Sequence, residues 1–99
     1  MFMLHGRLAA QPGKRDELLT ILSEDEHNER MPGCRLYRVA LDQADPDGVW
    51  VTEVWESEAA QSASLELDRV KGQIAQAMPL LDFEGFKRQQ LDARAGIPN

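Results

Sequence analysis

The stretch WVTEVWES, residues 50–57, decides how this chain can fold. Side chains on a β-strand alternate between its two faces, so an extended segment here points Trp50 and Trp55 in opposite directions. Large apolar side chains on both faces need cover on both faces. Helices of the same chain can supply one cover, and we expect the sheet of a second subunit to supply the other.

The residues on either side of this stretch predict a β-hairpin. Residues 34–41, CRLYRVAL, are rich in side chains that favour strands. Between them and residues 49–56 stands the sequence Asp45-Pro46-Asp47-Gly48, in which proline presets one φ angle and glycine is free to adopt a positive one. We therefore predict two antiparallel strands joined by this turn.

Periodicity identifies the remaining elements. Residues 2–10 alternate apolar and polar side chains, as a strand does. Apolar residues at 18, 19, 21 and 22 share one helical face, and Ser57 followed by Glu58 is typical of a helix start. Gly85 predicts a bulge or bend in the last strand. We predict strands at residues 2–10, 34–41, 49–56 and 80–91, a helix at residues 14–29, and one bent or two short helices at residues 59–78 with Asp68 as a second N-cap.

The order β-α-β-β-α-β predicts the ferredoxin-like α+β fold, in which a four-stranded antiparallel sheet carries its helices on one face. A chain of 99 residues suits one domain with one core. We expect residues 1–99 to form that domain, with residues 92–99 as a C-terminal tail. A domain of this size buries a modest share of its surface, which also favours dimerisation.

Composition argues against several kinds of partner. The net charge is −6 and the basic residues are scattered, so neither nucleic acid nor an anionic membrane is expected as a partner. No segment has the apolar length of a signal peptide or a membrane span. The single cysteine, Cys34, cannot form an internal disulfide, and no zinc-type spacing is present. We expect a cytoplasmic protein without a structural metal.

Glu53 is the first candidate for acid–base chemistry. It shares a strand face with Val51 and Trp55, so at least part of its side chain should be buried. A buried carboxyl either has a raised pKa, which suits proton abstraction, or is paired with a cation. The simpler interpretation is an ion pair with one of three arginines: Arg7, Arg35 or Arg38.

Five further side chains are candidates for a ligand site. A histidine side chain in water has a pKa of about 6.5, so the residue type at position 5 suits a base, although a hydrogen-bonded packing role is the simpler interpretation of His5. It should point away from the helices, toward the expected dimer side. Tyr37, Trp50 and Trp55 can stack on an aromatic ligand, or can pack in the core or in an interface. Ser64 can hydrogen-bond a ligand oxygen or bond locally within its helix.

Several short segments recur here in a known order and spacing. They are QPGKRDEL, PGCRLYRV, the Asp-Pro turn followed by VWVTEVWES, and AMPLL, and together they cover essentially the whole chain. In this arrangement the sequence resembles the antibiotic biosynthesis monooxygenase family, including its quinol monooxygenases. The resemblance implies a dimeric α/β barrel, a homodimer whose sheets meet face to face with a small apolar cavity in each subunit. It also implies oxygenation of a small aromatic molecule by O2 without a metal, flavin or other cofactor.

The resemblance carries over to the family's site residues only in part. Relatives that act on quinols often have a histidine at the position of Ser64. Haem-degrading relatives need an asparagine, a tryptophan and a histidine at positions that hold Gly6, Ser64 and Ile74 here. No haem is therefore expected.

Two functions from different classes stay open. The first is a cofactor-independent monooxygenase of a small aromatic or quinol substrate, with Glu53 or His5 as the base and the aromatic residues shaping the pocket. The second is a non-catalytic small-ligand-binding or stress-associated dimer, which Ser64 in place of the histidine favours. An isomerase or lyase on the same fold is a third possibility.

Overall fold

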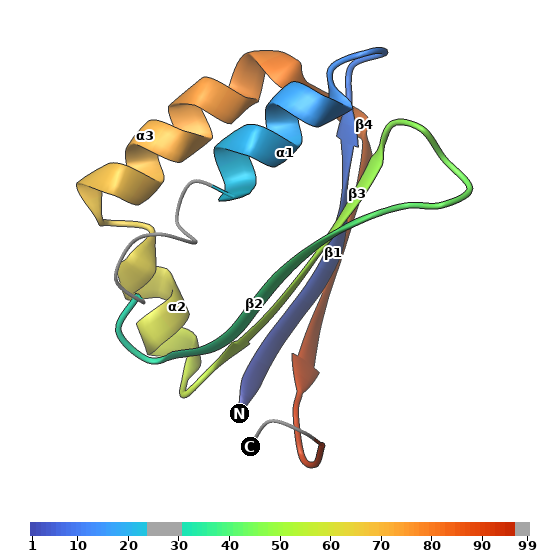
Figure 1. Ribbon diagram of the computed structural model, residues 1–99. Helices are drawn as coiled ribbons and strands as arrows, with labels where there is room; N and C mark the ends of the chain where they lie inside the picture. Colours follow the sequence, from blue (N-terminus) through green and yellow to red (C-terminus); the bar gives the residue numbers. More distant parts are fainter. Residues whose placement is uncertain (24–30, 97–99) are drawn as a thin grey trace.

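The computed structural model of the protein describes residues 1–23 and 31–96. Its elements follow the order β-α-β-β-α-α-β, and its four antiparallel strands stand in the order β2-β3-β1-β4 (Figure 1). The predicted ferredoxin-like arrangement is confirmed. The elements are β1 (Phe2–Ala10), α1 (Arg15–Ser23), β2 (Cys34–Leu41), β3 (Gly48–Trp55), α2 (Glu58–Ser64), α3 (Asp68–Ala77), a 3₁₀ turn at Met78–Leu80 and β4 (Leu81–Asp92).

The predicted strand bounds hold to within one residue. β1 and β2 match them, while β3 begins one residue early at Gly48 and β4 one residue late, because Leu80 belongs to the 3₁₀ turn. The helix predicted over residues 14–29 is observed from Arg15 to Ser23, so it begins one residue later than predicted, and residues 24–29 of the prediction lie outside the described residues.

The second helical region forms two short helices, one of the two arrangements that the sequence left open. The Ser57 side chain accepts a hydrogen bond from the Ala60 N–H at 3.1 Å, which confirms the predicted N-cap of α2. The N-cap of α3 is Leu67, so the prediction of Asp68 as an N-cap is wrong by one residue. Asp68 instead occupies the first turn of α3, where the positive end of the helix dipole favours its carboxylate.

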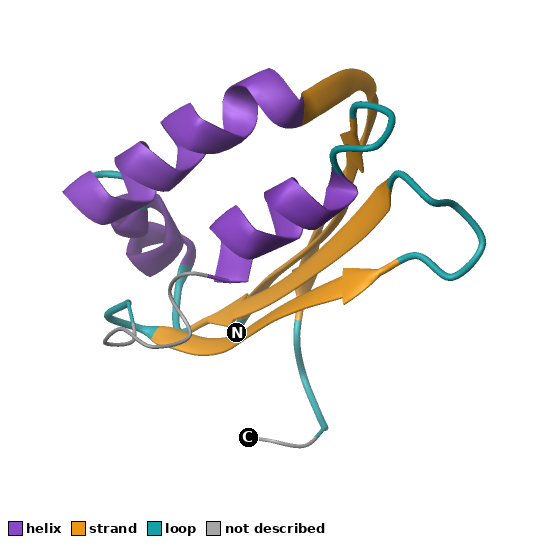
Figure 2. Ribbon diagram, turned by 45° about the horizontal axis from the view of Figure 1, so that its top comes forward, coloured by secondary structure: helices purple, strands orange, loops and turns teal. Residues whose placement is uncertain are grey.

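The core lies between the helices and one face of the sheet (Figure 2). Leu18 of α1 and Val49 of β3 have no exposed surface, and Ala77 of α3 packs with them. Because side chains alternate along a strand and share a face with their cross-strand partners, this contact identifies every position that faces the helices. These positions are Phe2, Leu4, Gly6, Leu8 and Ala10 of β1, Val49, Val51, Glu53 and Trp55 of β3, Tyr37, Val39 and Leu41 of β2, and Leu81, Arg88, Gln90 and Asp92 of β4.

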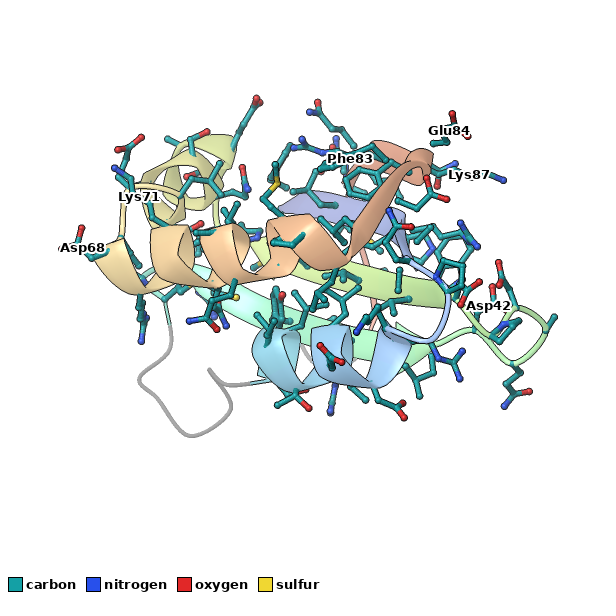
Figure 3. All side chains as sticks on the ribbon, turned by 90° about the horizontal axis from the view of Figure 1, so that it is seen from above. Asp42, Asp68, Lys71, Phe83, Glu84 and Lys87 are labelled. Carbon is teal, nitrogen blue, oxygen red and sulfur yellow. The ribbon has the colours of Figure 1, made fainter. Side chains whose placement is uncertain are left out.

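The predicted irregularity at Gly85 is a large bulge in β4. Arg7 pairs with Lys87 while Ala9 pairs with Asp82, so residues 83–86 stand outside the regular ladder. A Cβ on Gly85 would lie 2.3 Å from the Ala9 Cβ, and only glycine allows the bulge to close over β1. Figure 3 shows Phe83, Glu84 and Lys87 projecting from β4 in this part of the molecule. The rings of Phe83 and Phe86 lie 5.3 Å apart and are largely exposed.

The second face of the sheet carries no helix or strand in the part of the chain that the structure describes (Figure 1). We call it the open face. Its positions include Met3, His5 and Arg7 of β1, Trp50, Thr52 and Val54 of β3, Leu36, Arg38 and Ala40 of β2, and Lys87, Gln89 and Leu91 of β4. The outer edges of β2 and β4 are also without a partner strand among residues 1–23 and 31–96.

Candidate functional site

Glu53 lies on the inner strand β3, on the face beneath the helices. In the register of the sheet it stands opposite Tyr37 of β2 on one side and Leu4 of β1 on the other. Leu4 is buried, and Gln90 of β4 follows it in the same row across the sheet. The strand pattern thus places a carboxyl group between an aromatic and an aliphatic side chain.

Burial dominates the electrostatics of Glu53. It raises the pKa of the Glu53 carboxyl above its ordinary value, because an ionised carboxylate loses solvation there. Two interactions oppose this rise in pKa without cancelling it: the Trp55 indole N–H donates to Glu53 Oε1 at 3.0 Å, and Arg88 attracts the negative charge. A carboxyl with a raised pKa that is still oriented by a hydrogen bond has the properties of a general base.

The simpler interpretation of Glu53, an ion pair with one of three arginines, is wrong. Arg7 pairs with Asp45, and Arg35 pairs with Glu56 at 2.7 Å. Arg38 stands opposite Thr52, on the open face, so the sheet separates it from Glu53. The three arginines are candidates for Glu53 by charge alone. Two charged side chains can form an ion pair only if their strand positions face the same side of the sheet.

The cation that acts on Glu53 is Arg88 of β4, which the sequence did not reveal. Arg88 stands opposite Gly6, one row along the sheet from Glu53 and on the same face. A Cβ at Gly6 would lie 2.7 Å from the Lys87 carbonyl oxygen, so glycine is needed for β4 to approach β1 here. The bulge of four residues before Lys87 shifts the face of each later position. Arg88 could therefore be assigned a face only from the observed register.

Trp55 and the buried side of α2 form the next layer of this site. Trp55 has no exposed surface, and α2 packs against β3. The two buried residues of α2 are polar, Gln61 and Ser64. The Ser64 hydroxyl donates to the Gln61 carbonyl oxygen at 2.5 Å, which is the local bond predicted as one of its two roles.

His5 and Trp50 lie on the other side of the sheet. Their rings are stacked with centroids 5.2 Å apart, and His5 Nδ1 lies 2.9 Å from Thr52 Oγ1. The Trp50 indole N–H donates to Asp42 Oδ2 at 2.9 Å. The sheet thus brings together Glu53, Tyr37, Trp55 and Ser64 on the helix side and separates them from His5 and Trp50.

A groove of about 320 Å³ lies where the β4 bulge meets the loop between β2 and β3. Its wall contains four carboxyl side chains, Asp45, Asp47, Asp82 and Glu84, together with Arg7. Arg7 forms the ion pair with Asp45 and donates to the Gly85 carbonyl oxygen at 2.9 Å. The arginine therefore joins the loop to the bulge, and the groove is part of the framework of the sheet.

Neither a metal cluster nor a membrane helix is found in the described residues. Among residues 1–23 and 31–96, no three side chains of metal-binding type are grouped closely enough to hold an ion. Within the same ranges, no helix is both long enough and apolar enough to cross a bilayer. The cytoplasmic location stays a prediction.

Comparison with known proteins identifies relatives over nearly the whole chain. The family model described as antibiotic biosynthesis monooxygenase matches residues 1–76. A structure from Chloroflexus aurantiacus assigned to these monooxygenases has 40% identity and a TM-score of 0.87, and the match covers 96% of this chain and 94% of that one. A structure from Deinococcus radiodurans with the same assignment has 26% identity and a TM-score of 0.80, covering 100% and 98% of the two chains.

A more distant structure shares the fold alone. SnoaB from Streptomyces nogalater, a cofactor-independent oxygenase, has 14% identity and a TM-score of 0.78, and the match covers 99% of this chain and 97% of that one. No curated protein matches the sequence.

Proposed function

Because this chain belongs to the antibiotic biosynthesis monooxygenase family, we propose that it is a cofactor-independent monooxygenase of a small aromatic or quinol substrate, with Glu53 as the general base. One observation carries this proposal. Glu53 is a carboxyl on the helix side of the sheet whose pKa is raised by burial, and it is held by the Trp55 indole N–H. A residue with these properties can remove a hydroxyl proton at neutral pH.

The proposed reaction needs only the substrate, O2 and the base. The Glu53 carboxylate takes the proton of a ring hydroxyl and leaves an electron-rich phenolate. The phenolate passes one electron to O2, and the two radicals combine through a new carbon–oxygen bond to give a peroxide. Glu53 returns its proton to the peroxide and then takes the proton from the ring carbon that bears the peroxide. The electrons of that C–H bond form a ring carbonyl as the O–O bond breaks, and the hydroxide that leaves takes the proton from Glu53 and departs as water. The substrate supplies all four electrons that reduce O2, so no external reductant enters the balance.

Neighbouring residues support this role of Glu53. Arg88 exerts a positive potential on the carboxylate and can offset the negative charge that moves to the ring oxygen. Tyr37 stands beside Glu53 in the register, and Trp55 holds the carboxyl in one orientation. Tyr37 on the neighbouring strand and Trp55 two residues along β3 are aromatic neighbours of the base, and they suit an aromatic substrate, which stacks with offset rings.

The test is oxygen consumption by the purified protein over a panel of quinols and anthrone-like phenols. The Glu53→Gln variant should lose turnover by a factor of about 10² to 10⁴, because glutamine keeps the hydrogen bond to Trp55 and cannot accept the proton. Glu56→Gln is the matched control, since the exposed Glu56 pairs with Arg35 and should leave turnover unchanged. A His5→Ala variant tests the second candidate base.

Three results would change the proposal. Unchanged turnover in Glu53→Gln, or equal product with and without O2, would contradict it. Loss of turnover in His5→Ala alone would identify His5, on the open face, as the base. No oxygen uptake above the uncatalysed rate would favour the non-catalytic ligand-binding dimer.

We also propose that the protein is a homodimer whose subunits cover each other's open face. That face carries Trp50, Val54 and Leu91, and the exposed Phe83 and Phe86 lie on the bulge beside it. A second sheet would cover these side chains and could also protect the free edges of β2 and β4. Light scattering should give twice the mass of one chain. Val54→Arg, a charge in the middle of the open face, should give the mass of one chain.

A further inference from the structure

We propose that Arg7 is a positioning residue for the Glu53 site, and that it acts through the β4 bulge to hold Arg88 on the helix side of the sheet. Arg7 itself lies on the open face, so the sheet separates it from a substrate that Glu53 engages. The inference rests on the proposed function for the identity of the site, and it adds to that site a residue from the opposite face.

The bulge in β4 decides which face of the sheet Arg88 occupies. On the near side of the bulge, Ala9 pairs with Asp82. A ladder continued from that pair without a bulge would set Arg88 opposite Met3, an open-face position. The bulge shifts the register by an odd number of residues, and an odd shift exchanges the two faces. Arg88 therefore stands opposite Gly6, on the side of the sheet where the base lies.

Arg7 holds this bulge from the open face. Its guanidinium donates to the Gly85 carbonyl oxygen at 2.9 Å and forms an ion pair with Asp45, in the loop between β2 and β3. Only 14% of the Arg7 side chain is exposed, so both bonds are largely shielded from water. Because one of these bonds ends on a backbone oxygen of the bulge, it fixes the path of β4 itself.

Two glycines leave room for the guanidinium of Arg7. A Cβ on Gly85 would lie 2.9 Å from Arg7 Nη1, and a Cβ on Gly48 would lie 3.3 Å from Arg7 Nε. A side chain at the first position would displace the guanidinium, and one at the second would crowd it. The bulge and the start of β3 thus close around this arginine, although the three residues lie far apart in the sequence.

Two other contacts of the bulge are exposed to water. The Glu84 N–H donates to Asp82 Oδ1 at 3.1 Å in an exposed bond. The rings of Phe83 and Phe86 contact each other and are largely exposed. Water competes with an exposed hydrogen bond, whereas a shielded and charged one is stronger. The bonds of Arg7 should therefore contribute more to the bulge than these two contacts do.

The experiment measures whether the effect of Arg88 on Glu53 depends on Arg7. The pKa of the Glu53 carboxyl is followed by carbon NMR of protein with isotope-labelled glutamate, and its signal is identified by its absence in Glu53→Gln. Burial raises this pKa and Arg88 opposes the rise, so Arg88→Gln should raise the pKa further. In the Arg7→Met background, the same substitution should raise it by less than half as much. Neither substrate nor O2 is needed.

Two further backgrounds sharpen this titration. Arg35→Met is the matched control, because Arg35 forms an exposed ion pair with Glu56 in β2, at the opposite edge of the sheet from β4. There, Arg88→Gln should raise the Glu53 pKa as it does in the unsubstituted protein. Arg7→Lys keeps the positive charge but lacks the planar fork that bonds the loop and the bulge at once. It should give an intermediate effect, and it decides the question if Arg7→Met does not fold.

Turnover with the quinol panel should show the same coupling. Arg88→Gln and Arg7→Met should each lower turnover by about tenfold. The double variant should also lose about tenfold, whereas independent effects would multiply to about a hundredfold. A purely structural role of Arg7 would lower stability without making the two losses non-additive.

The outcomes separate this inference from the proposed oxygenase activity. An equal rise of the Glu53 pKa on Arg88→Gln, with and without Arg7, would overturn the inference, and so would no rise in either protein. Independent losses of turnover would overturn it as well. Failure of the oxygenase proposal would appear in the Glu53→Gln turnover and would leave the titrations as they are.

Discussion

Two tryptophan–carboxyl pairs lie on opposite faces of the same sheet, and their pKa shifts have opposite signs. Trp55 donates to Glu53 at 3.0 Å beneath the helices, and Trp50 donates to Asp42 at 2.9 Å on the open side. The pKa of the Glu53 carboxyl is raised, whereas that of Asp42 is lowered. An indole hydrogen bond therefore does not by itself set the direction of the pKa shift.

The difference comes from what surrounds each carboxyl. The bond from Trp50 is the main cause of the lowered pKa of Asp42, and the backbone N–H groups of Ala44 and Asp45 reinforce it at 2.8 and 3.1 Å. At Glu53 the loss of solvation outweighs its single hydrogen bond. The Trp50–Asp42 hydrogen bond fixes the loop between β2 and β3. The Trp55–Glu53 hydrogen bond orients a carboxyl group whose pKa is raised.

The largest difference between the two pairs should appear when each tryptophan is replaced by phenylalanine. Trp55→Phe removes ring volume from a fully buried site together with the indole hydrogen bond to Glu53, so the free energy of unfolding should fall by about 1–3 kcal/mol. Trp50→Phe affects a half-buried ring and should cost less. Urea titration at one protein concentration measures both values, and equal losses would contradict the contrast drawn between the two faces.

Replacement of Glu53 by glutamine should have a smaller and pH-dependent effect. The folded-state pKa of Glu53 is raised above its ordinary value of 4.5, so its contribution to stability is present below that pH and is lost as pH rises through the folded pKa. Glu53→Gln should therefore unfold at a higher temperature than the unsubstituted protein near pH 7, and the difference should disappear near pH 4. A thermal unfolding series across this range measures the effect, and a difference that does not depend on pH would show that Glu53 is not desolvated.

The smallest effect should come from Asp42→Asn, and it should have the reverse pH dependence. The folded-state pKa of Asp42 lies below its ordinary value of 3.8, so its contribution to stability is present above that pH and is lost as pH falls through the folded pKa. Asp42→Asn should slightly lower the unfolding temperature near neutral pH and should match the unsubstituted protein at strongly acidic pH. The same thermal series tests this, and a gain in stability at neutral pH would count against the assigned role of the loop carboxylate.

The fold could be predicted from local signals in the sequence. Alternation in residues 2–10, the turn at Asp45–Gly48 and the cap at Ser57 each act over a few residues, and the structure places the elements accordingly. Asp68 was misassigned because its acidic side chain suits both an N-cap and a first helical turn. Whether residues 59–78 form one bent helix or two helices depends on tertiary packing, so the local sequence pattern could not decide between them.

The candidate site could be predicted only in part. Glu53 was identified from its place between Val51 and Trp55, because strand alternation is a local rule. Arg88 was missed since the bulge at residues 83–86 hides the face of later positions in β4.

The two tryptophans, five residues apart on one strand, also give the protein two optical reporters in different surroundings. Trp55 is sealed from water, so its fluorescence should report the packing of α2 over the base. Trp50 lies on the open face beside His5, so its emission should shift when that face is covered and should be sensitive to the charge of the stacked imidazole. The single-tryptophan proteins Trp50→Phe and Trp55→Phe would thus let ligand binding and subunit assembly be followed separately, without an added label.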